Sequence, residues 1–281
     1  MKISGFTIAR NAVKFNYPLV ESIRSILPIC DEFVVNAGDS EDETLALIRS
    51  IHDPKIRVIQ RTWDMTRGRE VLADETNAAL KECRGDWAFY LQSDEVVHEE
   101  DLPRLKNVTQ KFIDDPSVDA LRFQWFHFYG SFYRYRIDQG WYQKQDRIIR
   151  NNGAIESYGD AFGFRRKDNR ELRRRNTGCY MYHYGWVQPE DMMAERLANA
   201  RTIGFADPQV RDLNNNFSYG DLNRFPVYFG THPGVMKDRI DRHTLSGEDL
   251  KNIERRYWWF PPKILKIRYK TGKRVRERIN K

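Results

Sequence analysis

The first 97 residues alternate between short apolar runs and stretches whose apolar residues recur at helical spacing. The apolar runs predict strands at 3–9, 33–35, 56–59 and 87–91, and the helical spacing predicts helices at 17–27, 44–51 and 71–82. Strands that alternate with helices indicate βαβ units and therefore a parallel sheet. We expect ligand-binding side chains at the carboxyl ends of these strands.

The pattern changes after residue 97. Residues 119–142 are dense in aromatic side chains, most of which we expect in the core because large aromatics dominate core burial. Further strands are predicted at 147–150 and 179–186, a helix at 189–203 and a loop at 204–224. We therefore divide the chain into a ligand-binding half (1–97), a second half of the same domain (98–224) and a C-terminal helical extension (225–281).

The composition is that of a folded globular protein. Of 281 residues, 40% are hydrophobic and 31% charged, which excludes a disordered chain, a collagen and a coiled coil. No apolar run is long enough to span a bilayer, and the first residues lack a signal-peptide core, so we expect a cytoplasmic protein. Three separated cysteines fit a reducing compartment and exclude a disulfide framework and a structural zinc finger.

The positive charge is confined to the C-terminus. The whole chain carries a formal charge of +7, but residues 255–281 alone carry +10 and the rest is mildly acidic. This distribution disfavours nucleic acid as a partner. Together with the aromatic run 257–260, it predicts a tail that rests on the anionic inner face of a membrane. The alternative is an ordinary solvated helix.

Acidic residues follow the fourth predicted strand. Gln92, Ser93, Asp94 and Glu95 come directly after it, and a carboxylate exposed at this edge of the sheet is suited to a hard divalent cation. Such a cation would lie between the carboxylate and the two phosphates of a nucleotide. A strand-end turn with solvated acids is the alternative.

A second acidic loop, 38–44, follows the second predicted strand. It lacks a GxGxxG motif and the lysine of a phosphate-binding loop, which disfavours a dinucleotide dehydrogenase and a P-loop kinase. Its acids are suited to accept hydrogen bonds from a base or a ribose. Ser40 or Asp42 is equally suited to cap the next helix.

These two loops, with Arg10-Asn11 after the first strand and Asn77 on the helix before the fourth, resemble family 2 glycosyltransferases of the GT-A fold. The stretches 127–130 (His-Phe-Tyr-Gly) and 182–186 (Tyr-His-Tyr-Gly-Trp) are similar to a bacterial subgroup of that family. The resemblance implies an α/β fold of GT-A type, with a Rossmann-like, mostly parallel central sheet flanked by helices and an aromatic-rich acceptor half. Ala37 and Gln92 depart from the family, which carries acids at both positions.

The resemblance also implies a site for a nucleotide-sugar donor, expected to be a uridine diphosphate sugar. The residues carried over to it are Ala9, Arg10, Asn11, Asp39, Asp64, Arg67, Asn77, Gln92, Ser93 and Asp94. Since Gln92 is not an acid, a divalent cation, Mn²⁺ or Mg²⁺, would depend on Asp94 and a later ligand. His183 is the candidate, because imidazole suits Mn²⁺, although a core histidine is equally credible among its aromatic neighbours.

The activity implied is inverting transfer of a sugar to a hydroxyl of a cell-surface or lipid-linked glycan precursor. Inversion needs a carboxylate that takes the proton of the acceptor hydroxyl. Asp160, flanked by Gly159 and Ala161, is the first candidate and Glu156 the second. The alternative for either acid is an ion pair with Arg165 or Arg166.

Two other classes of function stay open at this point. A nucleotidyltransferase would carry a glycine-rich stretch and a lysine after the first strand, where this chain has Arg-Asn-Ala-Val at 10–13. A non-catalytic membrane- or nucleic-acid-binding protein would depend on the basic tail, so that deleting 255–281 would remove its activity and spare an enzyme's donor turnover.

Overall fold

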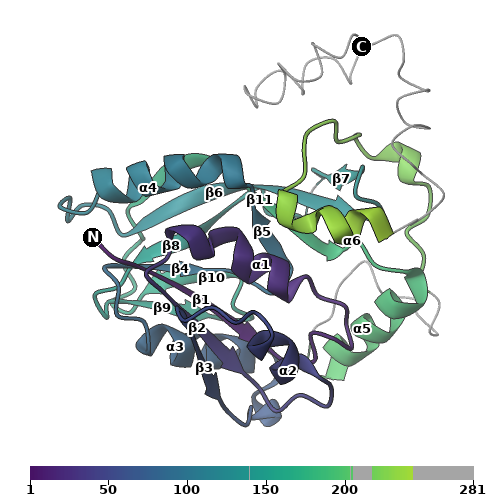
Figure 1. Ribbon diagram of the computed structural model, residues 1–281, viewed down its shortest axis with the longest axis horizontal. Coiled ribbons are helices and arrows are strands. Elements are labelled where there is room, and N and C mark those ends of the chain that lie inside the picture. The colour runs from purple at the N-terminus through teal and green to yellow at the C-terminus, as the bar shows by residue number, and fades with distance from the viewer. Residues whose placement is uncertain (139, 203, 205–216, 243–281) are drawn as a thin grey trace.

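Strands and helices alternate through the first half of the computed structural model, which describes residues 1–138, 140–202, 204 and 217–242 (Figure 1). The strands are β1 (Ile3–Ala9), β2 (Glu32–Ala37), β3 (Ile56–Gln60) and β4 (Trp87–Tyr90). The helices are α1 (Leu19–Ile26), α2 (Thr44–Arg49) and α3 (Val71–Lys81). Helix α1 begins two residues later than predicted because a residue before proline, here Tyr17, is disfavoured in helical conformation.

The second half is richer in strands than the sequence predicts. Its elements are β5 (Glu95–Val97), α4 (Leu102–Lys111), β6 (Ala120–Tyr129), β7 (Tyr135–Arg136), β8 (Lys144–Arg150), β9 (Ile155–Tyr158), β10 (Gly163–Arg166), β11 (Arg174–Trp186), α5 (Glu190–Thr202) and α6 (Lys237–Arg242). Most of the predicted loop 204–224 and the whole basic tail lie outside the described residues.

One mixed sheet contains most of these strands, in the order β3-β2-β1-β4-β8-β6-β11-β5, with β7 paired to β6. Strands β3, β2, β1 and β4 are parallel, as are β6 and β11. Strands β8 and β5 run antiparallel to their neighbours. The expected α/β fold of GT-A type, with a mostly parallel central sheet flanked by helices, is confirmed.

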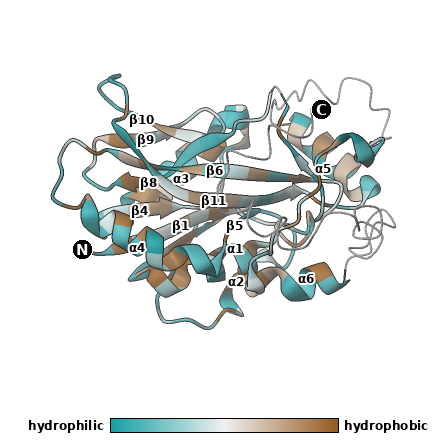
Figure 2. Cartoon of the chain, turned by 90° about the horizontal axis from the view of Figure 1, so that it is seen from above, coloured by the Kyte–Doolittle hydropathy of each residue, from teal (hydrophilic) through white to brown (hydrophobic). Residues whose placement is uncertain are grey.

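Each face of the sheet has its own apolar core, because successive side chains of a strand point to opposite faces. On β4, Trp87 and Phe89 pack on the side of α1, α2 and α4, whereas Ala88 and Tyr90 pack with α3 and the β9–β10 hairpin. In Figure 2 the central strands carry hydrophobic segments while the surrounding loops are mainly hydrophilic. Many of the aromatics of 119–142 are buried, as expected. Phe123 lies in the first of these cores, whereas Phe128 lies in a separate cluster with Tyr184 and Tyr228.

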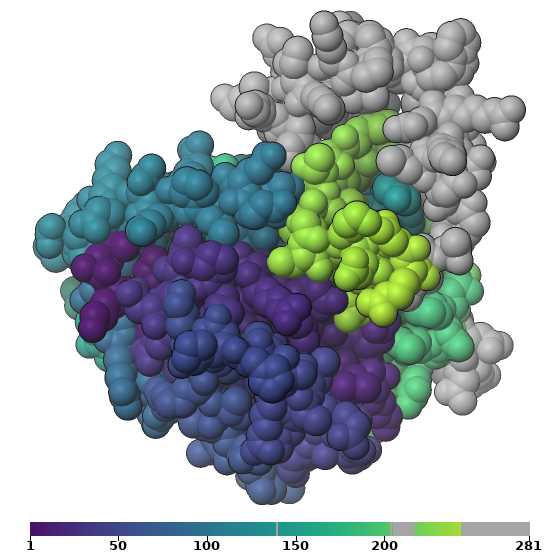
Figure 3. All heavy atoms as spheres, in the orientation of Figure 1, coloured from purple at the N-terminus to yellow at the C-terminus, as the bar shows by residue number. Residues whose placement is uncertain are grey.

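Residues 217–242 pack beside the N-terminal helix, as Figure 3 shows in yellow-green against purple. Arg239 of α6 bonds to Glu21 on α1 at 3.1 Å and to the carbonyls of Asn16 and Tyr17. The segment thereby fixes the loop that follows β1. No helix of the described residues combines the length and the apolar composition that crossing a membrane requires.

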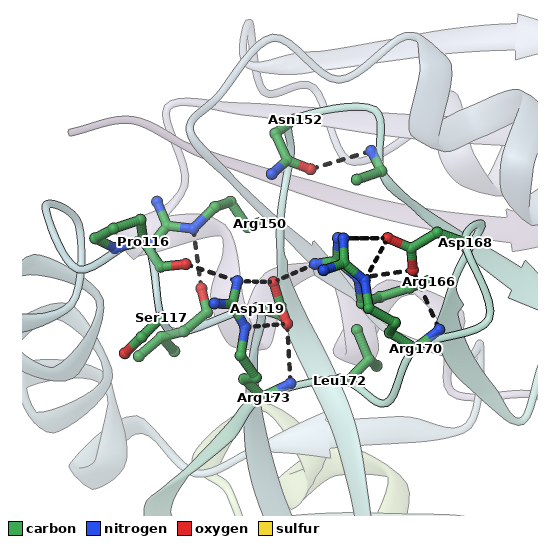
Figure 4. A network of polar contacts seen from close by, with 12 residues as sticks. Pro116, Ser117, Asp119, Arg150, Asn152, Arg166, Asp168, Arg170, Leu172 and Arg173 are labelled. Carbon is green, nitrogen blue, oxygen red and sulfur yellow. Dashed lines mark hydrogen bonds and ion pairs between the residues drawn. The ribbon is translucent and has the colours of Figure 1, made fainter.

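A buried carboxylate holds the start of β6 to the segment before β11 (Figure 4). Asp119 accepts hydrogen bonds from the guanidinium groups of Arg166 and Arg173 at 2.9–3.0 Å. Burial alone would raise the pKa of Asp119, but Arg173 and Arg166 outweigh it and lower that pKa. The positive charges of Arg166 and Arg173 are therefore partly neutralised within the fold.

Candidate active site

The loops after β1, β2 and β3 are bonded to one another. The Asp39 carboxylate accepts from the Arg10 guanidinium at 3.4 Å and from the Trp63 backbone N–H at 3.2 Å. Asn11 has a left-handed φ of 55° and accepts from the Glu41 N–H through its side-chain oxygen at 2.8 Å. The acidic loop also stabilises α2, since Asp42 accepts from the N–H of Thr44. The structure of this loop is thus compatible with both interpretations, binding of a base or a ribose and capping of the next helix.

The Asp94 side chain lies at the end of β4, as predicted, but it is 6% exposed rather than solvated. Its Oδ2 atom is 3.4 Å from Nε2 of His183 and 3.5 Å from Nη2 of Arg196. Burial alone would raise the pKa of Asp94, but His183 and Arg196 outweigh it and lower that pKa to about 2. The expectation of an exposed carboxylate is wrong because β11 and α5, which lie far along the chain, cover this edge.

His183 lies on β11 between β5 and β6, where its register partner on β6 is His127. The Nδ1 atoms of the two rings are 3.1 Å apart, and Nε2 of His127 is 2.7 Å from the carbonyl oxygen of Tyr142. Burial lowers the pKa of His127 to about 3, and His183 adds to the fall. His127 is therefore a neutral ring that contacts a backbone carbonyl on one side and His183 on the other.

Arg196 of α5 is a positively charged group beside Asp94. Its guanidinium donates to the carbonyl of Gly185 and lies 4.8 Å from the centre of the Tyr17 ring. Because Arg239 holds the backbone of Tyr17, the C-terminal segment supports this arrangement indirectly.

The turn between β9 and β10 carries Asp160 and is tied to the strand end that carries Asp94. Gln92 donates from its side-chain amide to the carbonyl of Ala161 at 3.3 Å, and Arg147 donates to the carbonyl of Phe162 at 2.9 Å. Arg147 in turn forms a fully buried ion pair with Glu95 at 2.7 Å. Ala161 is 1% exposed and has a left-handed φ of 59°, a costly conformation for a residue with a Cβ.

Asp160 has no hydrogen bond or ion pair within the described part of the chain. Burial raises the pKa of the Tyr142 hydroxyl, the carboxylates of Glu95, Asp94 and Asp160 add to the rise, and Arg147 opposes it.

Several predicted residues are held by other partners. Glu156 pairs with Arg165 at 2.9 Å, as the ion-pair alternative anticipates. The Asn77 amide forms reciprocal hydrogen bonds with the backbone of Ser157, and Asn77 and Glu156 both line a cavity of about 970 Å³ that Asp94 and Asp160 do not line. Arg67 pairs with Asp74, on the helix that follows.

The remaining donor candidates lie near the strand ends. The Ser93 hydroxyl donates to the carbonyl of Ile8 at 2.9 Å, and Ala9 is buried at the end of β1. Asp64 caps the short 3-10 helix Met65–Glu70 by accepting from the N–H of Thr66 at 3.1 Å.

Sequence reasoning did not single out Arg196, Arg147, Tyr142 or Tyr17. Arg196 lies on a correctly predicted helix, yet no local pattern separates it from Arg201 on the same helix. Arg147 sits in β8 among mostly polar neighbours (Lys-Gln-Asp-Arg-Ile-Ile-Arg), where a basic residue usually faces water. The pairing of β8 with β4 brings Arg147 to the site.

Residues 6–173 match the family model described as Glycosyl transferase family 2. The chain belongs to glycosyl transferase family 2. No curated protein matches it significantly in sequence.

Several solved structures align with this chain at low similarity. Residues 1–349 of S. aureus TarS in complex with UDP align at 18% identity and a TM-score of 0.44, over 74% of this chain and 68% of that one. This protein spans only 41% of the length of another S. aureus TarS chain. Glucosyl-3-phosphoglycerate synthase from Mycobacterium tuberculosis, in complex with Mn²⁺, UDP-glucose and phosphoglyceric acid, aligns at 18% identity and a TM-score of 0.32, over 45% of this chain and 44% of that one.

Because Gly185 has no side chain, Asp94 and His183 can approach each other beside it. A Cβ at this position would collide with Oδ2 of Asp94 and would lie 3.0 Å from Nε2 of His183. We expect Gly185→Ala to lower the rate of transfer about 100-fold, the usual cost of a displacement of about 1 Å in such a site. Steady-state kinetics would measure the loss. Gly234→Ala is the control, because its Cβ would meet only the exposed Glu99 side chain; equal rates for both variants would contradict this role of Gly185.

Proposed function

We propose that this protein is an inverting glycosyltransferase. It would move a sugar from a nucleotide-sugar donor, a uridine diphosphate sugar, to a hydroxyl of a cell-surface glycan precursor. The observation that carries the proposal is the ionised Asp94 carboxylate at the carboxyl end of β4, with His183 and Arg196 beside it. Membership of family 2 supports glycosyl transfer as the reaction class.

The donor would lie across the carboxyl ends of β1 to β4. The bonded loops around Arg10, Asn11 and Asp39 offer a carboxylate and amide groups to a base or a ribose. Asp64 lies on the next loop, and Ser93 and Asp94 come at the end of β4. The diphosphate would then point towards Asp94, where positive charge is available.

The donor atoms beside Asp94 fit a divalent cation, Mn²⁺ or Mg²⁺. Oδ2 of Asp94 and Nε2 of His183, 3.4 Å apart, would hold the ion together, since an oxygen and an imidazole nitrogen are both suited to Mn²⁺. The described residues contain no group of three or more His, Cys, Asp or Glu that could bind a metal alone. Oxygen atoms of the donor would complete the set. When bound, the cation would neutralise charge on the departing diphosphate.

Two side chains of this protein have defined tasks in the proposed reaction. Arg196 places a guanidinium next to Asp94, where it stabilises negative charge on the leaving diphosphate. Asp160 takes the proton of the acceptor hydroxyl, because it is free of ion pairs within the described chain while Glu156 is paired with Arg165. The turn contacts from Gln92 and Arg147 hold Asp160 in place.

The acceptor would approach past the aromatic residues near His127. Trp141 and Trp186 lie 5.4 Å apart between ring centres, and Trp141 lies 4.9 Å from the His127 ring. Flat aromatic surfaces of this kind suit sugar rings. A glycan carried on a lipid would also agree with a cytoplasmic enzyme whose basic tail, outside the described residues, contacts an anionic membrane surface.

Thermal shift with a panel of nucleoside diphosphates, with and without Mn²⁺, tests the donor and the metal together, since a ligand that binds the folded state raises the melting temperature. We expect UDP to bind more tightly with Mn²⁺ present. Asp94→Asn, which removes the negative charge of a proposed ligand, should weaken this binding at least about 10- to 100-fold, the range found for outer partners of metal sites. Glu41→Gln, an exposed acid of the same edge, is the control. Equal UDP affinity in Asp94→Asn and the wild type would contradict the proposal.

A further inference from the structure

The contacts of His127 determine where its proton lies. The carbonyl oxygen of Tyr142, 2.7 Å from Nε2 of His127, only accepts hydrogen bonds, so Nε2 carries a proton. The ring is 1% exposed, and its nitrogens contact only this carbonyl and His183. A positive charge there would be buried without a paired carboxylate, which is costly. His127 is therefore neutral, and its Nδ1 atom is an acceptor.

The same reasoning extends to His183. The two Nδ1 atoms are 3.1 Å apart, a hydrogen-bonding distance that requires one proton between them. Since His127 offers a lone pair, the proton belongs to Nδ1 of His183. Its other nitrogen, Nε2, then faces Oδ2 of Asp94 at 3.4 Å, and the pair needs either a proton or a cation between the two atoms.

We propose that His127 is a positioning residue that keeps the Nδ1 proton on His183 and thereby reserves Nε2 of His183 for a divalent cation held with Asp94. The Tyr142 carbonyl, His127 and His183 form a hydrogen-bonded series. This series lies behind the site and would not touch the donor. Ligand histidines in proteins commonly donate their other N–H to such a partner, which fixes the ring and raises its affinity for the ion. The inference rests on the proposed function only for the metal.

Two variants of His127 separate this role from simple packing. His127→Asn keeps an acceptor oxygen at the place of Nδ1, whereas His127→Phe keeps the ring volume and removes both nitrogens. We expect Mn²⁺ in the presence of UDP to bind His127→Asn within about threefold of the wild type. We expect it to bind His127→Phe about 10- to 100-fold more weakly. Electron paramagnetic resonance of free Mn²⁺ measures both affinities.

A second readout needs neither metal nor activity. Long-range ¹H–¹⁵N correlation spectra of the metal-free, histidine-labelled protein report which ring nitrogens carry protons, and His183→Gln assigns the signals. We expect a proton on Nδ1 of His183 in the wild type and in His127→Asn, and a bare Nδ1 of His183 in His127→Phe. If the wild type binds no Mn²⁺, the metal part of the proposed function fails and these spectra alone decide the inference. A bare Nδ1 in the wild type, or equal behaviour of His127→Phe and His127→Asn, would overturn it.

Discussion

Replacing Asp160 with asparagine should remove most sugar transfer while donor binding survives. The substitution keeps the shape of the side chain but removes its ability to take a proton, and a positioned general base contributes about 10²- to 10⁴-fold to a rate. The turn should keep its conformation, since its contacts run through the backbone carbonyls of Ala161 and Phe162. Single-turnover kinetics with saturating donor would measure the loss, and calorimetry with UDP would show unchanged binding.

Glu156→Gln distinguishes the two candidate acids. Glu156 bonds to the exposed Arg165 and lines a cavity that Asp160 does not line, so we expect its substitution to change transfer less than about fivefold. If Asp160→Asn transfers sugar normally and Glu156→Gln does not, Glu156 becomes the base. Normal transfer in both variants would exclude the β9–β10 hairpin as the source of the catalytic carboxylate.

Glu95→Gln should destabilise the fold strongly. Glu95 and Arg147 are both fully buried and 2.7 Å apart, and Arg147 also lies between the rings of Tyr90 and Trp125. Removing one charge leaves the other buried without compensation, which typically costs about 3–5 kcal/mol. Urea unfolding followed by fluorescence would measure the change in the free energy of unfolding.

A surface pair of equal length provides the control for this substitution. Glu82 and Arg57 are also 2.7 Å apart, but their side chains are 45% and 33% exposed. Glu82→Gln should cost no more than about 1 kcal/mol, because exposed ion pairs contribute little. Similar losses for the two variants would mean that burial does not set the strength of the Glu95–Arg147 pair.

The sequence predicted the elements of the first half well because each buried strand there is bounded by a periodic helix. It missed β5 and β9, which are three and four residues long and are stabilised by pairing with β11 and β10 rather than by their own pattern. Asp94 was placed at the correct strand end. Its burial was not foreseen, because the covering groups come from Gly185 and Arg196, about a hundred residues further on.

The histidines show the same limit. His183 was named as a ligand candidate from its residue type, and its neighbour Asp94 agrees with that hypothesis without testing it. The hydrogen bond between His183 and His127 depends on the register of β6 against β11, which local patterns do not contain. Long-range pairing therefore decides the fine geometry of the site, whereas local patterns decide which strand ends contribute to it.

Gln92 ties the end of β4 to the β9–β10 turn. Its side-chain amide N–H bonds to the carbonyl of Ala161, and Gln92→Glu would set two oxygen atoms against each other at that point. This substitution would therefore not simply add a second carboxylate beside Asp94, since it would also release the tip of the neighbouring hairpin. A second acid at position 92 is in this way compatible with the site only if the turn that it faces changes as well.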